Sequence, residues 1–120
     1  MNINQFSCRG LIYAAAFLMC AITANAHAIL KESTPAPNAV VTGPDITIRL
    51  RFNSRIDAAH SRIELTDGKQ ARAIEMGPQT APDTLSGKAS GIRPGTYKVQ
   101  WQVLATDGHL TRGEFPFTAR

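Results

Sequence analysis

The chain has 120 residues, with 13 Lys and Arg against 9 Asp and Glu. This length suits one small domain with a single hydrophobic core. The basic residues are spread along the chain and do not cluster with aromatic residues, which argues against a dedicated nucleic-acid-binding surface. We therefore expect one domain with no nucleic-acid partner.

The first segment has the pattern of an export signal. An apolar run at 11–23 is followed by Ala24-Asn25-Ala26, the small-residue pattern that signal peptidase recognises. An uncleaved membrane anchor is the alternative, but the run is shorter than the ~20 residues that a span needs. We expect residues 1–26 to be a cleaved signal peptide, and residues 27–120 to form a monomeric periplasmic domain.

Removal of this segment changes the set of possible metal ligands. Both cysteines, Cys8 and Cys20, belong to it, so the mature domain would have no disulfide and no thiolate ligand. Met76 would be the only methionine left. The mature part keeps all three histidines: His27, His60 and His109.

The segments that follow are short and alternate in polarity. His27 to Ser33 is predicted as an edge strand, and the two prolines of 34–38 exclude a helix there. Ile46 to Phe52 alternates strictly, which predicts a strand with one buried face. Ile63 to Thr66 repeats this alternation.

The second half of the chain continues the β pattern. Asp67-Gly68 predicts a hairpin that leads into a strand at 71–76. A loop follows at 77–83, and 84–88 gives no clear assignment. Two further strands are expected at 95–104 and 113–118, the second with Pro116 at a sheet edge or bulge.

No window after residue 27 shows a helical period, and turn residues recur every eight to twelve positions. This spacing predicts an all-β, Ig-like Greek-key sandwich of about seven strands. The core is predicted to contain Ile46, Ile48, Leu50, Phe52, Leu65, Tyr97, Val99, Trp101, Val103, Phe115 and Phe117.

Two segments carry metal-binding chemistry. Cleavage after Ala26 would make His27 the first residue, and its α-amine and ring Nδ1 can bind one ion in a six-membered chelate ring. Asp107 and His109 flank Gly108, and in extended backbone residues two apart point to the same side. Two imidazoles, one amine and one carboxylate suit Cu(II), and suit zinc or nickel less well.

Each segment also has a simpler interpretation. Asp107-Gly108 between two strands is a strong hairpin signal that needs no metal. His27 could follow the cleavage site by accident. Spacing alone does not show that the two segments meet.

A set of motifs spans most of the chain after residue 26. It comprises His27-Ala28, Ser33-Thr34-Pro35-Ala36-Pro37, Ile48-Arg49-Leu50-Arg51-Phe52, Pro94-Gly95-Thr96-Tyr97-Lys98-Val99-Gln100-Trp101, Asp107-Gly108-His109, Gly113 and Phe115. This set resembles the CopC family of periplasmic copper-binding proteins. The resemblance implies a cupredoxin-like sandwich or barrel with a Cu(II) site at His27, Asp107 and His109. It also implies a partner, either an inner-membrane copper transporter of the CopD type or a periplasmic cuproenzyme.

The chain departs from this family in two ways. Some members carry a methionine-rich Cu(I) site, which Met76 alone cannot supply. Some have a glutamate close to the Cu(II), whereas the corresponding stretch 53–57 has none, so we expect water or the three ligands alone to complete the site. His60 is predicted as a solvated loop residue, with an accessory copper contact as the alternative.

These observations favour a non-enzymatic Cu(II)-binding protein for copper resistance, homeostasis or cuproenzyme loading. One alternative is a copper-dependent oxidative enzyme, since lytic polysaccharide monooxygenases also bind copper through an N-terminal histidine. The Asp107 carboxylate argues against it, because that ligand would fill a position that oxygen activation needs open. The other alternative is a metal-free Ig-like interaction module.

Overall fold

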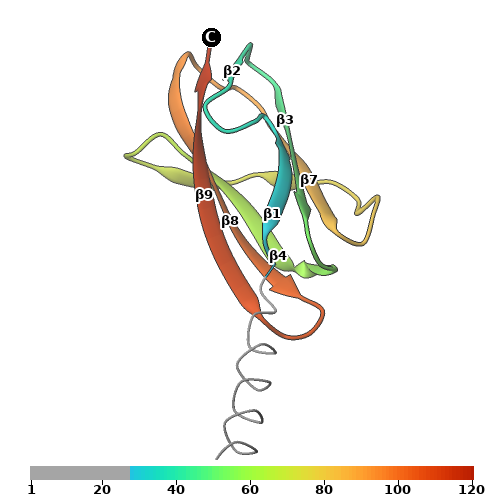
Figure 1. Ribbon diagram of the computed structural model, residues 1–120. Helices are drawn as coiled ribbons and strands as arrows, with labels where there is room; N and C mark the ends of the chain where they lie inside the picture. The colour runs from blue at the N-terminus through green and yellow to red at the C-terminus, as the bar shows by residue number, and fades with distance from the viewer. Residues whose placement is uncertain (1–27) are drawn as a thin grey trace, which may run out of the picture.

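The computed structural model describes residues 28–120, so the predicted signal segment and His27 lie outside the described residues. The described part contains nine strands and no helix (Figure 1). In chain order they are β1 (Leu30–Thr34), β2 (Val40–Val41), β3 (Ile46–Phe52), β4 (Ile56–Thr66), β5 (Ala71–Ala73), β6 (Glu75–Met76), β7 (Thr84–Ala89), β8 (Gly95–Ala105) and β9 (Leu110–Ala119). Within residues 28–120, no helix is long and apolar enough to cross a bilayer.

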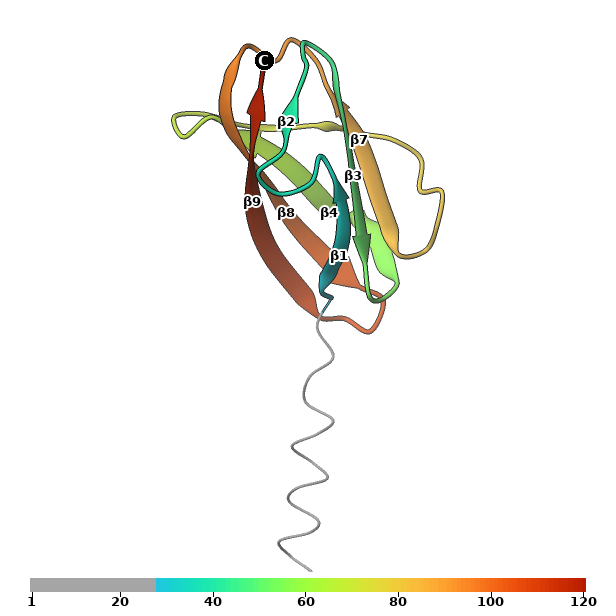
Figure 2. The same cartoon turned by 45° about the horizontal axis from the view of Figure 1, so that its top comes forward.

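The strands form two sheets. One has the order β1-β3-β7-β6 and the other the order β2-β9-β8-β4-β5. All pairs are antiparallel except β2 with β9. The two sheets face each other across one hydrophobic core (Figure 2). The all-β sandwich expected from the sequence is therefore confirmed.

The alternating pattern of β3 explains its position in the centre of the first sheet. Ile46, Ile48, Leu50 and Phe52 are buried, while the residues between them face outward. Most of the expected core is confirmed, but Tyr97 and Trp101 are only partly buried against it. The core also contains buried residues that the sequence analysis did not assign to it: Ala28, Ile56, Ile63, Ile74, Leu85, Ala89, Ile92, Ala105 and Ala119.

Two strands differ from the expectation because irregularities interrupt the alternating pattern. β4 begins at Ile56, and the pairing register with β8 shifts between Asp57 and Arg62. His60 therefore lies in a strand, at a bulge, and the prediction of a loop there was wrong. The expected strand at 71–76 divides at Ile74, because β5 pairs with β4 whereas β6 pairs with β7 in the other sheet.

The last strands extend beyond their predicted limits. The unassigned segment at 84–88 belongs to β7, which pairs with β3 along its whole length. β9 begins at Leu110 and pairs with β8 as far as Ala119. Pro116 lies outside the short stretch of β9 that pairs with β2, as expected for a residue without an amide donor.

Because Gly113 has no side chain, the Trp101 ring can lie directly against its backbone. The two residues are cross-strand partners in β8 and β9, and a Cβ at Gly113 would lie less than 3.0 Å from the indole. We expect Gly113→Ala to lower the free energy of unfolding by about 1–3 kcal/mol, because the ring must shift. Urea unfolding followed by fluorescence of the single tryptophan measures this change.

Gly77→Ala is the matched control, since a Cβ there meets Ser86 at 3.6 Å, an ordinary contact. Equal stability of the Gly113→Ala protein and the wild type would contradict the packing argument.

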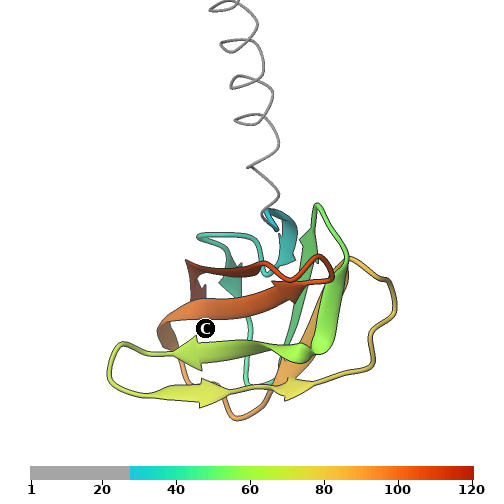
Figure 3. The same ribbon diagram turned by 90° about the horizontal axis from the view of Figure 1, so that it is seen from below.

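One end of the sandwich collects three segments that are distant in the sequence. The start of β1, the β3–β4 loop and the β8–β9 turn lie together at this end in all three ribbon views (Figures 1 to 3). The chain enters the sandwich here at Ala28, which is buried. The predicted ligands Asp107 and His109 lie in the β8–β9 turn of the same end.

Candidate metal centre

The β8–β9 turn places Asp107 and His109 on a tight hairpin. Gly108 N–H donates to the Ala105 carbonyl at 2.9 Å, and Ala105 N–H donates to the His109 carbonyl at 2.9 Å. Gly108 has a φ of 95°, a conformation that glycine adopts without steric cost. The hairpin interpretation is correct, and the same turn brings the two predicted ligands together.

The carboxylate of Asp107 contacts His109 in two ways. Its Oδ1 accepts the His109 backbone N–H at 3.0 Å and lies 3.1 Å from His109 Nδ1. These contacts, the backbone hydrogen bond foremost and the ring second, lower the pKa of Asp107. The carboxylate is therefore held in its ionised form, which is the form that binds a metal ion.

The spacing of these two atoms also matches that of adjacent ligands on one ion. A first-row divalent ion binds nitrogen and oxygen at about 2.0–2.1 Å, so ligands at right angles lie about 2.9 Å apart. In the metal-free protein this 3.1 Å contact is a hydrogen bond or ion pair, and an ion that replaces the shared proton needs only a small change in the spacing. Both side chains are about half exposed, so an ion can reach them from solvent.

Hydrogen bonds connect this turn to the beginning of β1 through the β3–β4 loop. Ile29 N–H donates to Asn53 Oδ1 at 2.7 Å, and Asn53 N–H donates back to the Ile29 carbonyl at 2.9 Å. Two residues further on, the Arg55 carbonyl accepts Thr106 N–H at 3.0 Å. The fold thus attaches the segment after His27 and the residue before Asp107 to the same loop.

The described residues supply only part of a coordination sphere. Between residues 28 and 120, no group of three or more His, Cys, Asp or Glu side chains converges on a point that could hold a metal. The third predicted ligand, His27, lies outside the described residues. A complete centre therefore needs a donor in addition to Asp107 and His109.

A second aspartate–histidine pair lies on the β4 bulge. His60 Nδ1 is 2.9 Å from Asp57 Oδ2, and both side chains are exposed to solvent. The sequence pattern does not mark Asp57 as a candidate ligand. In a regular strand, residues three apart point to opposite faces, so this spacing does not predict a contact. The bulge in β4 brings the two side chains together.

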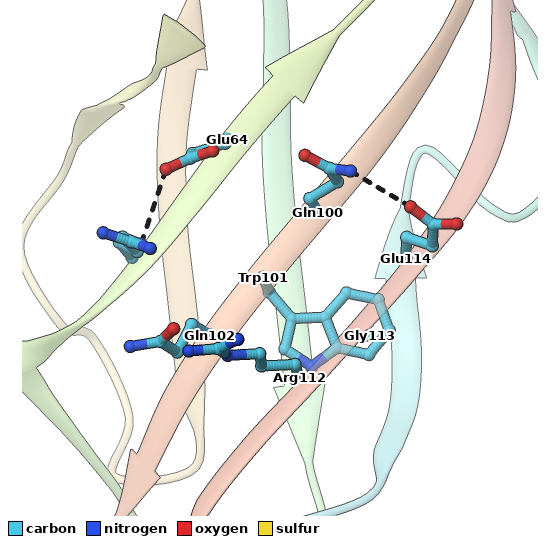
Figure 4. Close-up of a pocket in the computed structure, with 8 residues that line it drawn as sticks. Glu64, Gln100, Trp101, Gln102, Arg112, Gly113 and Glu114 are labelled. Atoms are coloured by element: carbon cyan, nitrogen blue, oxygen red, sulfur yellow. Dashed lines mark hydrogen bonds and ion pairs between the residues drawn. The ribbon is translucent and has the colours of Figure 1, made fainter. Parts of the chain in front are cut away.

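A hollow on the outer face of β4, β8 and β9 is another concave surface that could hold a ligand (Figure 4). Its two carboxylates have partners: Arg62 Nε lies 3.4 Å from Glu64 Oε1, and Gln100 donates to Glu114 at 3.1 Å. The Gln100 hydrogen bond and the Lys98 charge lower the pKa of Glu114, so this carboxylate is a poor proton donor. The hollow contains no histidine and does not have the ligands that copper prefers.

Comparison with known proteins identifies relatives along nearly the whole chain. The CopC domain model matches residues 30–120. Protein YobA of Escherichia coli K12 is 31% identical over 119 residues, covering 93% of this chain and 96% of YobA. Copper resistance protein C of Xanthomonas campestris pv. juglandis is 31% identical over 120 residues, covering 92% of each chain.

Solved structures agree with this result. CopC from Methylosinus trichosporium OB3b superposes with a TM-score of 0.69 at 27% identity, covering 78% of this chain and 93% of that one. PcoC, a methionine-rich copper resistance protein from Escherichia coli, has the same fold, with a TM-score of 0.67 at 24% identity and coverage of 79% and 100%. The chain therefore belongs to the CopC family.

Proposed function

We propose that this protein binds Cu(II) in the periplasm and sequesters it or delivers it to a partner. The observation that carries the proposal is the 3.1 Å spacing of Asp107 Oδ1 and His109 Nδ1, next to the start of β1 in a chain of the CopC family. The relatives named copper resistance protein C support copper as the ion. The proposed ligands are His27, through its amine and ring, together with Asp107 and His109.

In this proposal copper is cargo and the protein is not an enzyme. The recipient or donor is an inner-membrane copper transporter of the CopD type or a periplasmic cuproenzyme, and the protein acts as a monomer. Periplasmic location follows from the predicted cleavage after Ala26, which also creates the free amine of His27. Titration of the mature protein with Cu(II), followed by EPR, tests the proposal: one tightly bound ion with nitrogen hyperfine structure is expected. Absence of a copper signal at one equivalent would favour a metal-free interaction module.

The proposed ligands predict a preference for the oxidised ion. Nitrogen and carboxylate ligands suit Cu(II), whereas Cu(I) prefers thiolates and thioethers. In residues 28–120 there is no cysteine, and Met76 is the only methionine. We expect Cu(I) to bind more weakly than Cu(II) by more than about tenfold, so reduction would release the ion.

Competition with a Cu(I)-specific chelator under reducing conditions, and with a Cu(II) chelator in air, measures this difference. Met76→Leu is the control and should leave both affinities unchanged. Equal affinities for the two ions in the wild type would contradict release by reduction.

A further inference from the structure

We propose that Asp57 and His60 form a second, weaker Cu(II) site on β4. His60 Nδ1 and Asp57 Oδ2 form a hydrogen bond of 2.9 Å. The same separation suits adjacent ligands on one first-row divalent ion, which would take the place of the shared proton. The His60 side chain is 70% exposed and that of Asp57 is 36% exposed, so an ion can bind without unfolding the strand. The pair has the same donor atoms as Asp107 and His109, on a different element.

The bulge that forms this pair is held in place by hydrogen bonds. Asp57 is opposite Leu104 and Arg62 is opposite Gln102, so β4 places four residues where β8 places one. Ser61 Oγ donates to the Asp57 carbonyl at 2.6 Å and accepts Leu104 N–H at 2.9 Å. These bonds fix the extra residues of β4 against β8. In this conformation the His60 ring contacts the side chain of Asp57. Bulges commonly re-aim a side chain in this way.

One pair lies on β4 and the other in the turn after its neighbour β8, and the two pairs bind separate ions. Asp57 is opposite Leu104, which is opposite Leu110, the residue after His109. Strands are about 4.8 Å apart, so Asp57 and Leu110 are separated by about 10 Å. In the described part of the chain no three potential ligands converge on one point, so we assign the two pairs separate ions.

The chemistry of the second site suits exchange rather than storage. Two protein ligands leave the remaining positions of a tetragonal Cu(II) ion to water, so the ion binds weakly and leaves quickly. A weak, exchangeable site at the same end of the sandwich can pass copper to the first site or receive copper from it. This role rests on the proposed function, whereas the binding of copper to Asp57 and His60 does not.

Titration of the untagged mature protein with two equivalents of Cu(II), followed by calorimetry and EPR, tests the proposal. We expect a second ion with a Kd at least ~100-fold weaker than that of the first, since the second site has fewer protein ligands. His60→Gln and Asp57→Asn should each lower the affinity for the second ion at least tenfold and leave the affinity for the first ion unchanged. Dipolar coupling between the two ions should appear at two equivalents and disappear in His60→Gln.

The matched control is Asp67→Asn, an exposed turn aspartate whose carboxylate accepts backbone N–H groups. It should leave both binding steps unchanged. Binding of a single ion by the wild type, or a second ion that survives His60→Gln, would overturn this proposal. Loss of only the first ion on changing His109 would support the proposed function separately, because the second site does not contain that residue.

Discussion

Adding Gly-Ser before His27 is expected to weaken Cu(II) binding by at least ~100-fold. Loss of a residue that only hydrogen-bonds a metal ligand lowers metal affinity by about 10–100-fold. The extension removes a ligand itself, together with its chelate ring, so its effect should be at least as large. The amine of His27 becomes an amide, which no longer binds copper as a neutral amine does. Competition titration of the mature protein, produced with its native His27 terminus, measures the change.

A protein with Gly-Ser added after Arg120 is the matched control, because it carries the same two residues without blocking the amine. Its affinity should equal that of the wild type. His27→Ala keeps an amine but removes the ring, so it should lose affinity as well. An unchanged Kd in the N-terminally extended protein would show that the amine is not a ligand.

His109→Ala has the second-largest expected effect, a loss of about 100-fold in Cu(II) affinity with little change in stability. The substitution removes one imidazole and leaves Asp107 without its neighbouring nitrogen donor. The side chain is 54% exposed and lies in a turn, so its removal opens no cavity in the core. Chelator competition gives the affinity, and urea unfolding gives the stability.

His60→Ala is the comparison for this variant, since it also removes an exposed imidazole beside an aspartate. It should leave the first copper ion unaffected. The reverse pattern, a large loss with His60→Ala and none with His109→Ala, would move the principal site to the β4 bulge. Asp107→Asn should have a smaller effect than His109→Ala, because an amide oxygen can still accept the His109 N–H.

In the proposed function, signal-peptide cleavage also assembles the metal site. Before the bond after Ala26 is cut, the nitrogen of His27 is an amide and the chelate does not exist. Copper binding at the site that contains His27 would therefore begin only after export. This order would keep the precursor from binding copper tightly at this site before it reaches the periplasm.

Alternation of apolar and polar residues was sufficient to predict the regular strands. β3 and most of β8 match their predicted limits because every second side chain packs against the core, with Tyr97 and Trp101 of β8 only partly buried there. The pattern failed where pairing is irregular. The start of β4 was missed because its bulge interrupts the alternation, and β5 and β6 were merged because no local signal marks the passage between sheets at Ile74.

The sequence by itself determined the β-sandwich class and the donor groups that are available, because side-chain polarity and ligand type are local properties. It also identified Asp107 and His109 as candidate ligands, since two residues on either side of a glycine share one turn. Only the tertiary structure decided that this turn and the start of β1 attach to the same loop, through Asn53 and Arg55. It also decided that Asp57 meets His60. Both results depend on hydrogen bonds between segments distant in sequence or on a register shift, which a linear pattern does not contain.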